Sequence, residues 1–249
     1  MKPWPYPRLV AHRGGGALAP ENTLAGIRFG HSLGFRAVEI DVRFSRDDVP
    51  VLQHDASLER NTNGSGPIAE RSWEELASLD AGSWRGEEFR GEPLVRLPDA
   101  AAVLRGLRLY AQVEVKRVPG RHRECGDRVA REVRRCWAGA QETPLLISFS
   151  AEALAAASEA APELPRGWIV QSPWDGDLAP LEALDAVALH LEHVLISPAL
   201  VQEVHRRGRR LVAWTVNDAD RAEELTTAGV DAIVTDNLRE MAARFPQLL

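Results

Sequence analysis

The sequence has little cysteine, no long apolar run and no basic block, and each of these shortages excludes a class of protein. Only two of its 249 residues are cysteines, Cys125 and Cys136. Both fall in one expected helix, about three turns and roughly 16 Å apart along the axis, so they cannot form a disulfide with each other. Free thiols are typical of a reducing compartment, and we therefore expect a cytoplasmic protein.

Membrane and nucleic-acid partners are also disfavoured. No window approaches the about 20 apolar residues of a membrane span, and Met1–Pro7 holds three prolines in place of the apolar run of a secretory signal. The formal net charge of -6 argues against a nucleic-acid surface. We expect neither nucleic acid nor stable membrane association, and the oligomeric state stays open. An anionic substrate would need a local positive site, either a metal or particular basic residues.

The chain itself alternates between short apolar runs and helical patterns, in a composition that is 45% hydrophobic and 27% charged. Eight strands are expected, at residues 8–12, 37–43, 109–116, 144–149, 167–171, 186–191, 210–216 and 232–235. This alternation predicts an α/β fold, a (β/α)8 TIM barrel in one domain over residues 1–249, with catalytic groups at the C-terminal strand ends. An open doubly wound sheet is the competing fold, but it seldom has eight strands with acids at several ends.

Two segments depart from the strand and helix alternation. Residues 49–55 read as the return arm of a hairpin that brings His54 back beside the second strand. Residues 57–98 then form a long, glycine-rich insertion, and such excursions are usually functional, so we expect this one to roof the site. Helices are expected to open at Pro20–Thr23 and to run weakly over 175–184.

Acidic residues mark the ends of two expected strands. In an extended chain Glu39 and Asp41 share one face while their apolar neighbours pack behind them, and Glu114 and Lys116 repeat this design on the next barrel strand. Neighbouring carboxylates repel, and a hard divalent cation relieves that repulsion. Taken alone, the first segment could be an alternating edge strand with one solvated face, and Glu114 and Lys116 could be an exposed pair on a strand ladder.

Other strand ends carry His12, Arg13 and Trp214. His12 has an ordinary structural reading as a rim histidine, and Trp214 has one as a core tryptophan. On a closed barrel, however, they meet the acids and His54 at one mouth. Two histidines suit proton transfer at neutral pH, and Arg13 and Lys116 are basic residues that would attract an anionic substrate. Phe149, His190 and Asn217 also lie at strand ends, as weaker candidates for substrate contacts.

Taken together, these motifs resemble the signature of the glycerophosphodiester phosphodiesterase family. The resemblance rests on His12-Arg13-Gly14, Pro20-Glu21-Asn22-Thr23, Glu39-Ile40-Asp41-Val42, His54-Asp55 and Glu114-Val115-Lys116. The segments Trp4–Arg8 and Leu79–Trp84 are most similar to its cytosolic bacterial type. The similarity covers essentially the whole chain. It implies a barrel like that of the phosphatidylinositol-specific phospholipases C, with a small insertion after strand two.

The resemblance further implies hydrolysis of small-molecule glycerophosphodiesters to sn-glycerol 3-phosphate and an alcohol. It makes Glu39, Asp41 and Glu114 the ligands of a divalent cation, Mg²⁺ or Ca²⁺ with Mn²⁺ as an alternative. It also makes His12 and His54 the catalytic acid and base, in an order that the sequence does not fix. Arg13, Lys116 and Trp214 would bind substrate. A phosphodiesterase acting on lysolipids, like a lysophospholipase D, and a non-catalytic phosphodiester-binding barrel are the alternatives.

Overall fold

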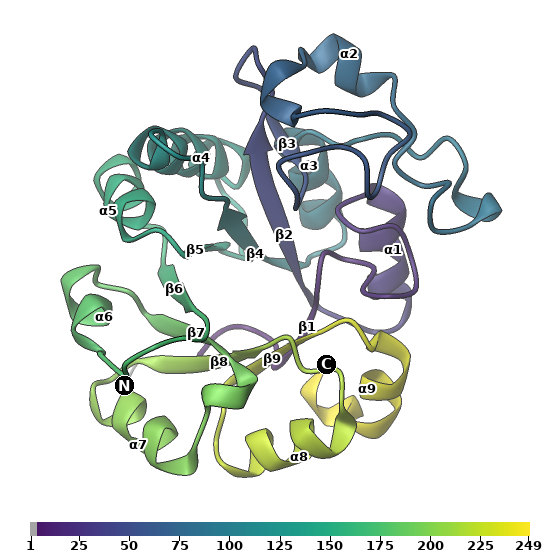
Figure 1. Ribbon diagram of the computed structural model, residues 1–249. Helices are drawn as coiled ribbons and strands as arrows, with labels where there is room; N and C mark the ends of the chain where they lie inside the picture. Colours follow the sequence, from purple (N-terminus) through teal and green to yellow (C-terminus); the bar gives the residue numbers. More distant parts are fainter. Residues whose placement is uncertain (1–3) are drawn as a thin grey trace.

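A computed structural model describes residues 4–249 and shows a closed parallel barrel surrounded by helices (Figure 1). Within these residues the sheet order is β1-β9-β8-β7-β6-β5-β4-β2, and pairing of β1 with β2 closes it into eight parallel strands. The barrel strands are β1 (Leu9–Ala11), β2 (Ala37–Phe44), β4 (Tyr110–Val115), β5 (Leu145–Ser148), β6 (Arg166–Val170), β7 (Ala188–Glu192), β8 (Arg210–Trp214) and β9 (Ala232–Thr235). The predicted TIM barrel is confirmed.

The predicted hairpin is confirmed as well. Strand β3 (Pro50–Leu52) pairs antiparallel with the end of β2, which sets Leu52 opposite Val42. The turn between these strands is held by the Ser45 hydroxyl, which donates to Asp47 and accepts from the Val49 backbone N–H. Because β3 returns along β2, His54 is carried back to the mouth of the barrel.

Helices pack around the outside of this barrel (Figure 1). They are α1 (Leu24–Ser32), α3 (Leu97–Gly106), α4 (His122–Cys136), α5 (Ala151–Ala160), α6 (Ala179–Ala183), α7 (Pro198–Arg206), α8 (Ala219–Thr227) and α9 (Leu238–Arg244). Side chains cap several of them: Ser150, Ser197 and Asp218 each accept a hydrogen bond from a backbone N–H of the first turn. None of the helices within residues 4–249 combines the length and the apolar character that a membrane crossing requires.

Two expected helix starts were wrong. Helix α1 begins at Leu24 and not at Pro20, because Thr23 is its N-cap and accepts from the Gly26 N–H. Helix α6 occupies only Ala179–Ala183, because the Asp175 and Asp177 carboxylates accept from backbone N–H groups two residues ahead and hold that segment in turns.

The strand alternation divides the core into two layers. Val38, Ile40 and Val42 of β2 are fully buried and belong to the large apolar cluster between barrel and helices. Glu39 and Asp41 alternate with them and therefore face the barrel interior. On β2, the sequence pattern thus places charge inside the barrel and hydrocarbon outside it.

The insertion, residues 57–98, has its own apolar cluster against β3. Leu58, Ile68, Leu76 and Leu94 pack with Val51 of that strand. The segment contains the short helix α2 (Trp73–Ala77), which a Ser72–Glu75 capping box begins, and it projects beside α1 at the edge of the barrel (Figure 1). The single-domain organisation of 1–249 stays a prediction.

The contact between α4 and α5 gives the first testable prediction. A Cβ added at Gly126 of α4 would lie 2.1 Å from the backbone oxygen of Ala153 in α5. Alanine ordinarily stabilises a helix relative to glycine by about 1 kcal/mol. Here we expect Gly126→Ala to lower the free energy of unfolding by about 1–3 kcal/mol, because the helices must separate. Urea denaturation would measure this.

Gly106→Ala is the matched control for that substitution. Gly106 ends α3, and a Cβ there would meet nothing within 4 Å. We expect it to leave stability unchanged or to raise it. An unfolding free energy for Gly126→Ala equal to or above that of the wild type would contradict the close helix packing.

Candidate active site

A cavity of about 590 Å³ opens where the barrel strands end at their C-terminal side. Seven of the eight site residues predicted from the sequence line it, namely His12, Arg13, Glu39, His54, Glu114, Lys116 and Trp214. The eighth, Asp41, is 1% exposed and lies in the carboxylate cluster beside the cavity. The structure therefore brings together residues from five separate strand ends.

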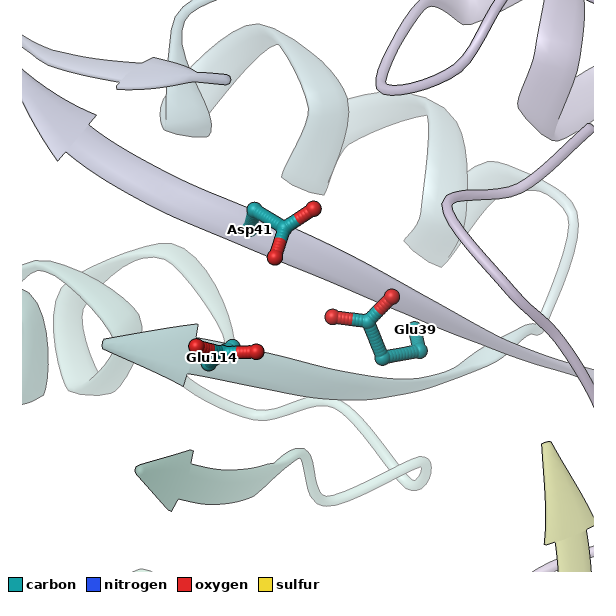
Figure 2. A group of neighbouring side chains, drawn as sticks. All are labelled: Glu39, Asp41 and Glu114. Atoms are coloured by element: carbon teal, nitrogen blue, oxygen red, sulfur yellow. The ribbon is translucent and has the colours of Figure 1, made fainter. Parts of the chain in front are cut away.

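The three acids form one compact group (Figure 2). Parallel pairing of β2 with β4 sets Asp41 directly opposite Glu114, and the alternation of β2 brings Glu39 to the same face. One carboxylate oxygen from each residue lies within 4.8 Å of the others, and all three residues are buried.

Burial and mutual repulsion control the ionisation of this group. Burial, reinforced by Asp41 and Glu114, raises the pKa of Glu39 well above its usual value. Burial and then Asp41 likewise raise the pKa of Glu114 to about 7. Burial opposes the ionisation of Asp41 too, but Lys116 and Arg13 overcome it and hold the pKa of Asp41 below its usual value. The site thus carries more carboxyl groups than its own cations neutralise.

Two basic side chains supply the positive charge. Lys116 Nζ lies 3.1 Å from Asp41 Oδ1 and 2.9 Å from Glu114 Oε1. Burial alone would lower the pKa of this lysine, but Asp41 and Glu114 outweigh burial and raise the pKa, which keeps the lysine protonated. Arg13 Nε lies 3.5 Å from Asp41 Oδ2, and the Arg13 backbone N–H donates to Glu39 Oε2 at 3.2 Å.

The cluster has the chemistry to hold a divalent cation. Glu39 Oε1 is buried and has no hydrogen-bond partner among the residues that the structure describes. Such an atom is costly unless something satisfies it. Carboxylate oxygens are the ligands that hard cations prefer, so Glu39, Asp41 and Glu114 fit an ion of this kind.

Each histidine is held by a carboxylate through Nδ1. His12 Nδ1 lies 2.6 Å from Asp236 Oδ1, and His54 Nδ1 lies 2.6 Å from Asp55 Oδ1. Burial opposes ionisation of Asp55, but hydrogen bonds from Arg60 and His54 lower its pKa to about 2. An ionised carboxylate only accepts hydrogen bonds, so Nδ1 donates and Nε2 is left for proton transfer. Burial lowers the pKa of His54, which favours its neutral form.

Sequence reasoning did not find Asp236, although a signal was present. Asp236 directly follows β9, so the strand-end rule that selected the other residues also applies to it. Asn217 holds it in place by donating to Oδ2 at 3.1 Å and accepting from the Asp236 N–H at 2.8 Å. Asn217, a weak substrate-contact candidate in the sequence, therefore supports the carboxylate that binds His12.

Asn22 was likewise missed as a support for the acids. Its side chain donates to Asp41 Oδ2 at 2.8 Å and accepts from the Asp41 backbone N–H at 3.0 Å. The residue has a positive φ of 57°, a conformation that asparagine tolerates better than most residues. These two hydrogen bonds fix the loop before α1 against β2, which is why Pro20–Thr23 is not helical.

An aromatic wall lies on another side of the cavity. The rings of Phe149 and Trp214 meet edge to face with centroids 5.5 Å apart, and the Arg117 guanidinium lies 4.9 Å from the Phe149 ring centre. His190 is also part of the lining but is 1% exposed and bonded to Gln112. Burial lowers its pKa to about 3, so it remains neutral.

The predicted roof over the site was wrong. Ala56 lines the cavity, but no residue of 57–98 does so within the part of the chain that the structure describes. The reason is that the insertion buries its apolar residues against β3, beside the barrel (Figure 1), and does not reach over the cavity.

Comparisons with known proteins identify the family of this chain. The model of the glycerophosphoryl diester phosphodiesterase family matches residues 12–240. A glycerophosphodiester phosphodiesterase of Caldanaerobacter subterraneus subsp. tengcongensis is 30% identical over 233 residues, which cover 92% of this chain and 93% of that protein. A putative glycerophosphodiester phosphodiesterase of Bacillus subtilis is 31% identical over 237 residues, with 92% and 93% covered.

Solved structures give the same result. A phosphodiesterase of Oleispira antarctica, solved in complex with the product sn-glycerol 3-phosphate, superposes with a TM-score of 0.91 and 33% identity, covering 97% of each chain. A putative glycerophosphoryl diester phosphodiesterase of Silicibacter pomeroyi gives a TM-score of 0.85 at 27% identity, covering 98% of this chain and 95% of that one.

Acids and carboxylate-held histidines that share one barrel mouth define a hydrolytic enzyme more readily than a carrier. The matched relatives are phosphodiesterases, and the similarity to them covers nearly the whole of this chain. The chain therefore belongs to the glycerophosphoryl diester phosphodiesterase family. The predictions of the family, of the barrel and of an enzyme of this kind are confirmed.

The ionisation of Glu114 predicts a pH-dependent stability. Burial, followed by the neighbouring Asp41, raises the pKa of Glu114 from about 4.5, its ordinary value, to about 7 in the folded protein. The fold thus favours the protonated form, so this stabilisation is present below about pH 4.5 and is lost as the pH rises through 7. In protein freed of metal by a chelator, we expect Glu114→Gln to raise the unfolding free energy at pH 8 and to remove part of the decline between these values.

Denaturation at pH 5 and pH 8 would measure the effect, which is on the order of 1.4 kcal/mol per pKa unit. The matched control is Glu163→Gln, which neutralises an exposed carboxylate far from the cluster and should leave the pH dependence unchanged. A Glu114→Gln protein that loses as much stability as the wild type between the two pH values would refute the assignment.

Proposed function

We propose that this enzyme hydrolyses small glycerophosphodiesters to sn-glycerol 3-phosphate and a free alcohol, using a divalent cation and two histidines. One observation carries the proposal. The triple carboxylate cluster and two histidines, each fixed through Nδ1 by its own carboxylate, lie at the same cavity. The complex of the Oleispira antarctica relative with sn-glycerol 3-phosphate supports the choice of product.

The proposed chemistry assigns one proton transfer to each histidine. One imidazole accepts at Nε2 a proton of the attacking water, whose oxygen bonds to phosphorus, while the other donates its Nε2 proton to the alkoxide that leaves as the P–O bond breaks. Transfers of this kind contribute about 10²- to 10⁴-fold in rate each. Asp236 and Asp55 each accept a hydrogen bond from Nδ1, which keeps that nitrogen protonated and leaves Nε2 for the transfer.

Positive charge at the phosphate comes from several groups. Glu39, Asp41 and Glu114 would hold the divalent cation, Mg²⁺ or Ca²⁺, which supplies Lewis-acid stabilisation of the phosphoryl oxygens when bound. Arg13 and Lys116 line the same cavity and would neutralise the remaining charge on these oxygens.

The remaining walls suit a small substrate. Trp214 and Phe149 form a flat apolar surface against which the glycerol or the alcohol group would pack. The large apolar side chains that are exposed within residues 4–249 are Trp84 and Val194, which is too little to favour docking to lipid. A cytoplasmic location is part of the proposal, since Cys125 and Cys136 are both free.

Substrate turnover with controlled metal tests the function. We expect the protein to release sn-glycerol 3-phosphate from glycerophosphocholine or a similar diester, to lose this activity in excess chelator, and to regain it with Mg²⁺ or Ca²⁺. Enzymatic detection of glycerol 3-phosphate is the measurement. Full activity in chelator would count against the cation, and preference for lysophosphatidylcholine would favour the lysolipid alternative. Tight diester binding without turnover at saturating metal would indicate a binding barrel.

Removal of either histidine tests the acid-base assignment. We expect His12→Ala and His54→Ala each to lower kcat by about 10²- to 10⁴-fold, because one proton transfer loses its catalyst. Circular dichroism would establish that the fold is kept. His122→Ala is the control, since His122 bonds Glu152 on the outer helices and does not line the cavity. Rates near wild type in both active-site variants would exclude the assignment.

A further inference from the structure

We infer that Arg60, a residue of the insertion 57–98, is a positioning residue for the reaction. It acts through two carboxylates, that of Asp55, which is hydrogen-bonded to His54, and that of Glu21, which is hydrogen-bonded to Arg13. The inference rests on the proposed function, because it concerns the groups that carry out that reaction. It also gives the insertion a role other than that of a roof.

The two Nη atoms of Arg60 bind Glu21, in the loop before α1. Arg60 Nη1 lies 2.7 Å from Glu21 Oε2, and Nη2 lies 2.7 Å from Oε1, which makes a two-pronged ion pair. Glu21 is 7% exposed. Its carboxylate also accepts from Arg13 Nη1 at 3.2 and 3.1 Å. Glu21 therefore holds the guanidinium groups of Arg13 and Arg60 side by side, and each restrains the position of the other.

The Nε atom of Arg60 binds the carboxylate of Asp55, which orients His54. Arg60 Nε donates to Asp55 Oδ2 at 2.5 Å, while Asp55 Oδ1 is bonded to His54 Nδ1 at 2.6 Å. Each oxygen of the Asp55 carboxylate thus has its own partner: Oδ2 accepts from Arg60 of the insertion, and Oδ1 binds the imidazole of His54. Without Arg60, the Asp55 carboxylate could rotate, and the ring of His54 would lose its fixed direction.

Arg60 does not act by touching substrate. It does not line the cavity, and its side chain is 43% exposed. Its influence must therefore pass through Asp55 and Glu21. Only arginine offers Nε and both Nη donors in one rigid plane, so lysine would keep the charge but could not hold both carboxylates in this geometry.

The packing of the insertion explains why Arg60 can perform this role. Leu58, two residues earlier, is 1% exposed in the apolar cluster of the insertion. Asn61, the next residue, exchanges side-chain hydrogen bonds with Gln53 of the segment that precedes His54. The backbone on both sides of Arg60 is therefore anchored, and the guanidinium is presented to the site from a fixed position.

Arg60→Met, which keeps the length of the side chain without its charge, tests the inference by kinetics. We expect kcat to fall about 10- to 100-fold, because a misdirected catalytic group costs this much, and KM to change less than kcat. Arg60→Lys should recover only part of the loss. Arg71→Met is the matched control, since Arg71 lies in the same insertion and pairs with the exposed Glu75, away from Asp55 and Glu21.

A second measurement needs no turnover. In protein labelled with ¹⁵N at histidine, an imidazole Nδ1 proton held against a carboxylate gives a downfield, slowly exchanging signal. His54→Ala assigns the His54 signal by its loss. In Arg60→Met we expect the His54 signal to broaden or disappear and that of His12, which is bonded to Asp236, to remain as an internal control. Arg71→Met should retain both signals.

The two measurements separate the possible failures. An Arg60→Met protein with kcat within about threefold of wild type overturns the inference, and so does one that keeps the His54 signal unchanged. If the wild type releases no sn-glycerol 3-phosphate from any diester, the proposed function fails. The histidine signal then still decides whether Arg60 holds His54.

Discussion

Three carboxyl groups buried against one another inside a barrel create the electrostatic constraint on which the rest of this structure depends. Parallel pairing of β2 with β4 forces Asp41 and Glu114 into adjacent positions, and the alternation of β2 adds Glu39. Burial, and after it repulsion among the carboxylates, raises the pKa of Glu39 and Glu114. The cost of this arrangement is offset only in part by Lys116 and Arg13, so the cluster retains an affinity for further positive charge.

A second layer of polar groups keeps this arrangement rigid. Asn22 clamps Asp41 through two hydrogen bonds, Asp236 fixes His12, and Asp55 fixes His54. Groups that exchange protons or bind phosphate must be held in position before substrate arrives, and paired hydrogen bonds from separate loops do this better than one flexible side chain can. The insertion contributes to the same layer through Arg60 and not by covering the cavity.

The residues that the sequence identified were those that obey a local rule. The two-residue period of a strand separated Glu39 and Asp41 from the apolar side chains behind them, and the C-terminal strand ends of a barrel gave the location of the site. The family resemblance supplied the roles. Asp236 obeyed the same strand-end rule but stands outside the motifs of that resemblance, and so it was missed. The helix starts at Pro20 and Asp175 were wrong because side-chain hydrogen bonds competed with helix formation there.

By itself, therefore, the sequence determined the barrel, the order of its strands and the chemical types that reach its mouth, because hydrophobic periodicity and strand ends are local properties. Only the tertiary structure decided which carboxylate pairs with which base and where residues 57–98 lie. Asp236 and His12 are 224 positions apart, and Arg60 reaches Glu21 across 39. Contacts at such separations depend on the registry of the whole closed sheet and on the competing burial of apolar groups, which no local pattern encodes.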